Sequence, residues 1–417
     1  MTGRAIVLRG DARALPLPDA CADLIVTSPP YFGLRSYTDD GAHYDGQIGS
    51  EASPREWLAA LAECTAEWVR VLKPSGSIFV NLGDKYAGSA SGGTQNGACG
   101  KRGTDGDRKR GHVRTAQGIM PQTDIPAKSL LGLPWRYALA CIDDLGLILR
   151  RDIIWSKPNG LPESVTDRCR SSHEYLFHLT RQPRYYAAVD EIREPHQPQS
   201  IARTHRNRFA PDLSQAGVGS PNTLNPADAC NPLGKLPGSV WDIPSQPLTV
   251  PAALGVDHFA AFPMELPRRC VLGWSPPGVC TACGEGRRPV THKEHFVLDT
   301  AADRWATELH ASTRGLTAAR GRRRAERDIT GYACACPQPD APVRPALVLD
   351  PFGGTGTTAL VAAAYGRTGI SVDMSGDYSR LARWRITDPG ERAKALQVPK
   401  PPPVPDGQVS LFDMEAS

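Results

Sequence analysis

The chain has 417 residues, is 40% hydrophobic, and carries 48 basic against 44 acidic side chains, a net charge of +4 at pH 7. This composition supports a sizeable globular core, and the length exceeds what one core usually reaches, so we expect one large domain with insertions. With no apolar run of transmembrane length and no signal-peptide core in its first ten residues, the sequence indicates a cytoplasmic rather than a membrane or secreted protein.

Alternating strands and helices are predicted over the first 190 residues. The expected elements are strands at 5–8 and 23–27, a helix at 53–72, a strand at 77–82, a helix at 130–145, and strands at 148–155 and 175–179. The helix at 53–72 is well marked, because Ser53 can cap it, Pro54 suits its first position and Glu56 completes a capping box. Residues 86–118 are Gly-rich and basic without apolar periodicity, which predicts a flexible surface loop.

The second half of the chain contains one further α/β stretch. Residues 191–255 are polar, Pro-rich and irregular, and residues 276–340 hold four cysteines and an Arg-rich stretch. A strand at 346–349, a helix at 357–365, a strand at 369–372 and a helix at 378–386 are expected next. The Pro-rich end, taken as residues 391–417, is expected to be disordered.

A glycine-rich turn between an apolar strand and a helix is the first candidate site. It comprises Asp350, Pro351, Phe352, Gly353, Gly354, Gly356 and Thr357. Glycines allow the backbone to approach a ligand, and the helix N-terminus offers unpaired N–H groups. Asp373 ends the next strand, where an acid can hold ribose hydroxyls. The alternative is a plain tight turn with Asp373 as a helix cap.

The second candidate site is Ser28-Pro29-Pro30-Tyr31, directly after the apolar strand at 23–27. Two prolines fix the backbone and leave carbonyl oxygens that no local N–H can reach. These oxygens and the Ser28 hydroxyl can accept hydrogen bonds from an exocyclic base amine, and Tyr31 offers a flat face for an extruded base. Alone, Pro-Pro-Tyr is also typical of a turn or a polyproline ligand.

Together the two motifs resemble those of the amino-methylating DNA methyltransferases of phages and bacteria. Because the catalytic motif precedes the cofactor motif, the order is that of the permuted beta group. His258, Phe262 and Pro263 are similar to a third cofactor element of the family. The resemblance implies an α/β fold with a Rossmann-like, mostly parallel sheet covered by helices on both faces, and S-adenosylmethionine as cofactor.

The resemblance also implies the reaction and the segments that carry it. Residues 1–190 would form the catalytic half, 191–255 the target-recognition region, and 256–275 with 341–390 the cofactor-binding half. Ser-Pro-Pro-Tyr is commoner among cytosine-N4 enzymes of the family, so methylation of cytosine N4 in duplex DNA is favoured over adenine N6. An RNA methyltransferase and a zinc-containing DNA-binding module remain as alternatives. Asp84 and Trp155 are further candidates for the base pocket.

Four cysteines in two close pairs, Cys280 and Cys283 with Cys334 and Cys336, suit a tetrahedral structural zinc ion, Zn²⁺, in an insertion at 276–340. The alternative is four unligated thiols. Cys21, Cys64 and Cys141 lie in apolar segments and are expected in the core.

Three basic stretches are candidates for contact with the DNA backbone. Their representative residues are Arg108, Arg110, Arg203, Arg206, Arg322 and Arg323. For each stretch a solvated charged surface is the alternative. Near the end of the chain, Gln408, Leu411 and Phe412 resemble the short peptide with which bacterial proteins bind the replication sliding clamp, a pattern that also arises by chance.

Overall fold

The computed structural model describes residues 3–33, 38–39, 42–43, 46–87, 125–160, 162–200, 231–255, 262–298, 322–338 and 340–400. The chain divides into two compact units. Unit 1 contains residues 1–186, 239–279 and 344–417, and unit 2 contains residues 187–238 and 280–343.

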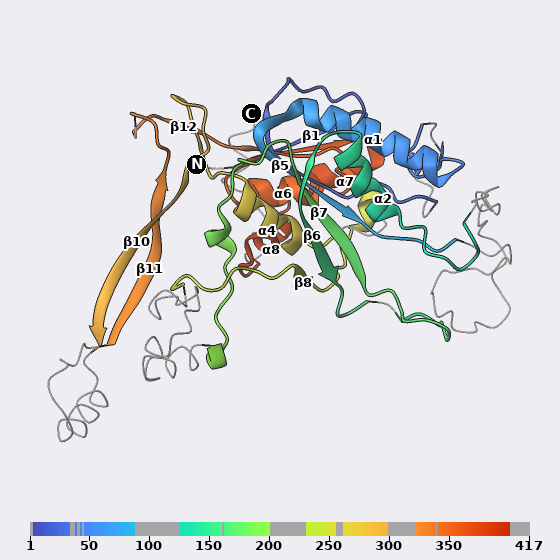
Figure 1. Ribbon diagram of the computed structural model, residues 1–417. Coiled ribbons are helices and arrows are strands. Elements are labelled where there is room, and N and C mark those ends of the chain that lie inside the picture. The colour runs from blue at the N-terminus through green and yellow to red at the C-terminus, as the bar shows by residue number, and fades with distance from the viewer. Residues whose placement is uncertain are drawn as a thin grey trace, which may run out of the picture. The chain divides into compact units, whose positions relative to one another are not determined.

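An eight-stranded sheet in the order β1-β14-β13-β2-β5-β7-β6-β8 is the framework of unit 1 (Figure 1). The strands are β1 Arg4–Arg9, β2 Ala22–Thr27, β5 Leu72–Leu82, β6 Ile148–Ser156, β7 His173–Thr180, β8 Val240–Asp242, β13 Leu347–Asp350 and β14 Thr368–Asp373. The first five strands in the sheet order are parallel, whereas β7 is antiparallel to both β5 and β6. The expectation of a mostly parallel α/β sheet is confirmed.

Helices cover both faces of this sheet. They are α1 Pro54–Val71, α2 Leu133–Asp143, α4 Glu265–Trp274, α6 Thr357–Ala364, α7 Gly376–Thr387 and α8 Pro389–Leu396. Figure 1 shows α1 and α2 on one side of the sheet and α4, α6 and α8 on the other. Because both faces are covered, β2 is buried along its whole length, which explains its continuous apolar sequence.

The start of α1 follows the predicted capping chemistry. The Ser53 side chain accepts a hydrogen bond from the Glu56 backbone N–H at 3.2 Å, and Pro54 occupies the first turn. Trp57, Leu61 and Trp68 then lie on the buried side of the helix, at helical spacing. This face packs into the core that α1 shares with α2, β2 and β5.

Unit 2 contains a long antiparallel pair of strands, β10 Arg288–Leu298 and β11 Arg322–Ala333 (Figure 1). We did not predict these strands, because their polar sequences lack the alternation of a half-buried strand. Shorter elements in the chain are β3 Thr38–Asp39 with β4 Ala42–His43, β9 Val279–Cys280 with β12 Val343–Arg344, and the 3₁₀ turns Val189–Ile192 and Ala252–Leu254.

Several predicted boundaries differ from the structure. The helix expected at 130–145 begins only at Leu133. Residues 73–76, which lie between the predicted helix and the predicted strand, belong to β5, which pairs with β2 from Leu72 onward and shifts register before Ser77. The region expected at 191–255 is divided, because residues 239–255 belong to unit 1, where β8 extends the sheet. The disordered tail expected from residue 391 is wrong over the last turns of α8.

Candidate active site

The two candidate motifs follow adjacent parallel strands of one sheet. Strand β2 ends at Thr27, directly before Ser28, and β13 ends at Asp350, directly before the glycine-rich turn. The strands pair in register, with Leu24 opposite Val348. Because parallel strands have their carboxyl ends at the same edge, segments more than 300 residues apart in sequence become neighbours at the position where open α/β sheets bind ligands.

The buried side chain of Asp350 connects the end of β2 to the glycine-rich turn after β13. One carboxylate oxygen accepts hydrogen bonds from the Thr27 hydroxyl at 2.7 Å and from the Phe352 N–H at 3.1 Å. The other accepts the Thr358 hydroxyl at 2.9 Å. Asp350 is 1% exposed, and burial raises its pKa from the ordinary value of 3.8 to about 6 against the lowering effect of these bonds. Its side chain therefore fixes the relative position of both motifs.

A cavity of about 290 Å³ opens at this edge of the sheet, and both motifs line it. The catalytic-loop candidates Ser28, Pro29, Pro30 and Tyr31 form part of its wall. The cofactor candidates in the wall are Pro351, Phe352, Gly353, Gly354, Thr357, Asp373 and Phe262. The structure therefore brings together the two stretches of chain that the sequence analysis singled out.

The glycine-rich turn is shaped by close backbone contacts. A Cβ atom at position 353 would lie 1.9 Å from the Ser371 Oγ, so only glycine fits there. The Gly354 N–H donates to one carboxylate oxygen of Asp373 at 2.8 Å, and the Ser375 N–H donates to the other at 2.9 Å. Asp373 thus shapes the turn while it lines the cavity, but it is not the helix cap that the alternative interpretation expected. The cap of α7 itself is Ser375.

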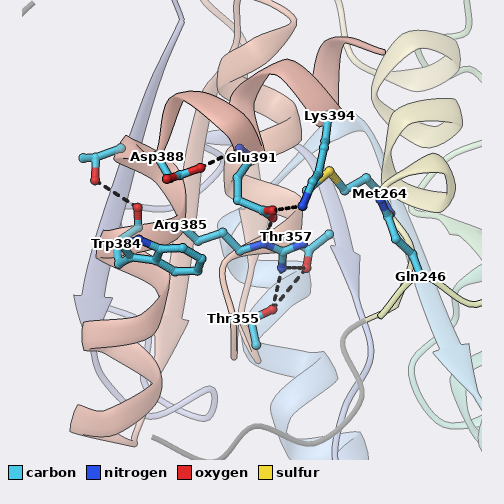
Figure 2. Close-up of polar contacts among 10 residues, drawn as sticks. Gln246, Met264, Thr355, Thr357, Trp384, Arg385, Asp388, Glu391 and Lys394 are labelled. Atoms are coloured by element: carbon cyan, nitrogen blue, oxygen red, sulfur yellow. Dashed lines mark hydrogen bonds and ion pairs between the residues drawn. The ribbon is translucent and has the colours of Figure 1, made fainter. Parts of the chain in front are cut away.

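A buried arginine supports the turn from behind (Figure 2). Arg385 is 3% exposed and donates to the hydroxyls of Thr355 and Thr357 at 2.8 and 2.6 Å. Its Nε donates to Glu391 of α8 at 2.9 Å. Burial lowers the pKa of Arg385, and the ion pair with Glu391 opposes that change. The contacts connect the cavity wall to α8, the helix that the sequence did not predict.

Hydrogen bonds also fix the catalytic loop. The indole Nε1 of Trp57 donates to the Pro30 carbonyl at 3.0 Å, so one of the two carbonyls that we expected to remain available is already used. Among the described residues, no donor contacts the Pro29 carbonyl. A Cβ at Gly83 would lie 2.8 Å from Cε2 of Tyr31, so the absence of a side chain there leaves room for the phenol ring.

Five polar side chains form one network in the cavity wall. The Ser28 hydroxyl donates to the Tyr31 hydroxyl at 3.5 Å, and Tyr31 donates to Oε2 of Glu174 at 2.7 Å. The Asn81 amide donates to Tyr31 at 2.8 Å and to Glu174 at 2.7 Å. Lys157 forms an ion pair with the other oxygen of Glu174, and its ammonium lies 4.2 Å from the centre of the Trp155 ring. The network draws on four strands. Asn81 lies in β5 and Glu174 in β7, whereas Ser28 and Tyr31 lie in the loop after β2, and Lys157 directly follows β6.

Sequence reasoning missed Asn81 and Glu174. Asn81 interrupts the apolar sequence of β5, and Glu174 is the second residue of β7, before the buried part of that strand. Only the antiparallel pairing of β7 with β5, which places Tyr175 opposite Leu82, puts Glu174 at the carboxyl edge of the parallel strands. Trp155, considered earlier, does line the cavity. Asp84 does not, because it accepts the backbone N–H groups of Gly132 and Leu133 at the start of α2.

The remaining cofactor candidates lie apart from the cavity wall. Asp350 is beneath the turn, Gly356 precedes α6 with a φ of 73°, and Pro263 is buried next to Phe262. His258 is outside the described residues.

The four predicted metal ligands come together in unit 2. The sulfur atoms of Cys280, Cys283, Cys334 and Cys336 all lie within 4.8 Å of one another. Two of these separations are 3.8 Å, from Cys280 to Cys336, and 3.5 Å, from Cys334 to Cys336. A tetrahedral zinc site with bonds of about 2.3 Å needs sulfur separations of about 3.8 Å, so the donor set and its spacing fit this ion.

The predicted DNA-contact and clamp residues are only partly described. Arg322 and Arg323 lie in β11. Arg108, Arg110, Arg203 and Arg206 are outside the described residues, as are Gln408, Leu411 and Phe412. Within the described part of the chain, no helix has both the length and the apolar character needed to cross a membrane.

Comparison with known proteins identifies the family. Residues 22–282 and 344–383 match the family model for DNA methylases of the N6/N4 type. The type II methyltransferase M.Cfr9I of Citrobacter freundii is 35% identical over 66% of this chain and 74% of its own length. M.SmaI of Serratia marcescens is 28% identical over 91% of this chain and 90% of its own.

The solved structure of the cytosine-N4-specific PvuII DNA methyltransferase shares the fold, with a TM-score of 0.50 and 16% identity over 95% of this chain and 91% of that one. The permuted motif order, the shared cavity and the matched family model agree with each other. The chain therefore belongs to the family of amino-group DNA methylases.

Proposed function

We propose that this protein transfers a methyl group from S-adenosylmethionine to the N4 amine of cytosine in duplex DNA. The observation that carries the proposal is the shared cavity, which Ser28 and Pro29 line together with Gly353 and Asp373. An exocyclic amine is a poor nucleophile because its lone pair is delocalised into the ring. Acceptors for its protons make the nitrogen more nucleophilic, and the Ser28 Oγ and the Pro29 carbonyl are such acceptors.

The cavity wall suits a cofactor with a nucleoside and a charged amino acid part. Glycines 353 and 354 allow close backbone approach, and Asp373 offers a carboxylate for ribose hydroxyls. Gln47 is 5% exposed and lines the cavity, and neither of its amide atoms has a partner among the described residues. A buried amide normally has hydrogen-bond partners, which a bound ligand would supply here. S-adenosylmethionine supplies an electrophilic methyl group on a sulfonium.

Ser28 favours cytosine over adenine as the substrate, following the preference of the family for Ser-Pro-Pro-Tyr in N4 enzymes. PvuII DNA methyltransferase, whose solved structure shares this fold, is cytosine-N4-specific, in agreement with this choice. The base itself would reach the cavity by leaving the duplex, because the reacting amine is inaccessible within paired DNA. Adenine N6 is the second candidate, because serine and the carbonyl would accept its amine protons equally well.

Incubation with deuterated-methyl S-adenosylmethionine and duplex DNA tests the proposal. After digestion to nucleosides, mass spectrometry should find the label in N4-methylcytosine. Label in N6-methyladenine instead would show that adenine, not cytosine, is the base that is methylated. DNA from many sources should be tested, so that a target sequence is present. Absence of label from both nucleosides would refute a DNA amino-methyltransferase.

A structural zinc ion in unit 2 is part of the same proposal. The four cysteine sulfurs offer a complete tetrahedral set, which leaves no position for a substrate and is typical of a structural rather than a catalytic metal. The site would lie at one end of the β10–β11 pair, where Arg288 pairs with Ala333, because Cys280 and Cys283 precede β10 and Cys334 and Cys336 follow β11. The basic residues Arg322 and Arg323 in β11 are then candidates for contact with the DNA backbone.

A further inference from the structure

We infer that Glu174 is the terminal acceptor of the proton that the target amine loses, and that Ser28 and Tyr31 transmit it. This inference rests on the proposed function and deepens it, because direct attack by an amine requires a way for that proton to leave. The family motif contains Ser28 and Tyr31, whereas Glu174 lies in β7, about 140 residues later, and only the fold brings it into the site.

The first observation is the direction of the hydrogen bonds. Ser28 donates to Tyr31, and Tyr31 donates to Glu174, so both hydroxyl protons point toward the carboxylate. A carboxylate can only accept, which fixes the direction of the whole chain. One lone pair of the Ser28 Oγ accepts the Asn81 amide, and the other is available to the amine, which must donate. The orientation that makes Ser28 an acceptor is therefore set by Glu174.

The second observation is that neighbouring groups fix each member of the chain. The Asn81 amide donates to Tyr31 and Glu174, and it also contacts the Ser28 Oγ at 3.5 Å. Lys157 pairs with the second oxygen of Glu174, leaving Oε2 for Tyr31. The Glu174 side chain is 17% exposed and lines the cavity, so a proton that it receives can later pass to water.

Methyl transfer releases one proton from the amine, and the two hydroxyls pass it to Glu174. The amine nitrogen forms a bond to the methyl carbon while the carbon–sulfur bond breaks and its electron pair stays on sulfur. The nitrogen, now cationic, gives one proton to the Ser28 Oγ. Ser28 gives its own proton to the Tyr31 oxygen, and Tyr31 gives its proton to Glu174. The amine ends neutral and methylated, both hydroxyls are restored, and Glu174 holds one proton.

The distances support such a transfer in a substrate complex. The step from Tyr31 to Glu174 has the length of a strong O–H···O⁻ bond, at 2.7 Å. The step from Ser28 to Tyr31 is long at 3.5 Å, and catalytic hydrogen bonds in sites without substrate commonly shorten when the substrate binds.

Glu174→Gln separates proton acceptance from positioning. A glutamine oxygen can still accept the Tyr31 hydroxyl bond and fill the same space, but the side chain cannot take up a proton at neutral pH. We expect the single-turnover rate of methyl transfer to fall roughly 100-fold, a typical size for general acid–base catalysis, with the Kd values for cofactor and DNA changed less than about twofold. The matched control Glu63→Gln, on the exposed face of α1, should react at the wild-type rate.

A second variant, Glu174→Ala, removes the carboxylate and leaves space for a small one. Formate should restore at least about a tenth of the lost rate in Glu174→Ala and none in Glu174→Gln, since only the first variant has room for an added proton acceptor. A Glu174→Gln rate within about threefold of wild type, or a Glu174→Ala loss that formate does not relieve, would overturn the relay.

The wild-type reaction in the same assay separates the two hypotheses. Methyl transfer to DNA by the wild type together with an undiminished Glu174→Gln rate would overturn the relay alone. A wild-type protein that transfers no methyl group to any DNA would overturn the proposed function and the relay with it.

Discussion

At the residue scale, Ser28 has two kinds of neighbour. Its proton is directed at Tyr31, and the residue lines the cavity together with Pro29 and the glycine-rich turn. An acceptor that contacts the base amine, rather than the cofactor, should affect the chemical step more than cofactor binding.

Ser28→Ala should therefore lower the single-turnover rate of methyl transfer by roughly 100-fold or more, the usual effect of removing one preorganised polar contact from a reacting group. Isothermal titration should give a Kd for S-adenosylmethionine within about twofold of wild type. If cofactor affinity fell as much as the rate, Ser28 would belong to the cofactor site instead.

The raised pKa of Asp350 predicts that the stability of the protein depends on pH. Because its folded pKa is raised from 3.8 to about 6, the folded state binds the proton more tightly than the unfolded state does. Its contribution to stability is therefore fully present below about pH 3.8 and is lost as the pH rises through about 6. A difference of about two pKa units corresponds to about 3 kcal/mol.

The isosteric variant Asp350→Asn removes this titration and gives the reference. The free energy of unfolding of wild type minus that of the variant should fall between pH 4 and pH 7, as measured by urea denaturation at each pH. A difference that rises with pH over this range would show that Asp350 is stabilised in its charged form.

At the element scale, the strands and helices near the two motifs could be predicted, and the contacts between distant elements could not. The Ser53 cap, the apolar run of β2 and the strand–turn–helix at Asp350 are local patterns that persist in the fold. The Glu174 position depends on the antiparallel pairing of β7 with β5, and α8 is held by Glu391, whose burial no local pattern indicates. The Arg-rich sequence of β11 likewise lacks a strand pattern.

Substitutions at Arg385 and Glu391 should change the stability of the protein and its cofactor affinity in different ways. Breaking a buried ion pair on one side typically costs about 3–5 kcal/mol, whereas replacing both partners by apolar residues is often neutral. Arg385→Met should therefore destabilise the protein strongly, and Arg385→Met with Glu391→Met should recover most of the loss. Lys394, which also pairs with Glu391, moderates the effect of the single substitution.

Cofactor affinity should not recover in that double variant. Thr355 and Thr357 lose the same guanidinium donor in both variants, so the Kd for S-adenosylmethionine should stay raised by about tenfold, the equivalent of one hydrogen bond to a charged group. Calorimetric titration beside thermal unfolding measures both quantities. Affinity that returned together with stability would show that Arg385 acts on the cofactor site only through folding.

At the scale of the whole molecule, the boundaries of the two units differ from the segment boundaries predicted from the sequence. Unit 2 is built from two separate segments, and the four cysteines lie in the second of them. The cysteine spacing was sufficient to predict that these four sulfur atoms lie close together. The division of residues 191–255 between the units could not be predicted, because β8 joins the sheet through only three residues.

Metal removal should act on unit 2 without affecting the cofactor cavity, because every residue that lines the cavity belongs to unit 1. We expect one zinc ion per chain by elemental analysis, lost in Cys334→Ser and retained in Cys169→Ser, a control at an exposed cysteine. Chelation should weaken DNA binding and leave the Kd for S-adenosylmethionine within about twofold. Equal zinc content in the two serine variants would exclude the four-cysteine site.

The central claim is that the catalytic loop and the glycine-rich turn face one another across a single cavity that holds both reactants. A crystal structure with S-adenosylhomocysteine measures this directly, through the distance between the cofactor sulfur and the Ser28 Oγ. The sulfur should lie in the cavity within about 8 Å of that oxygen, which is the sum of a carbon–sulfur bond of about 1.8 Å, a reacting distance of about 3.5 Å from the methyl carbon to the amine, and a hydrogen bond of about 3 Å. A cofactor bound elsewhere, or with its sulfur pointing away from residues 28–31, would contradict it.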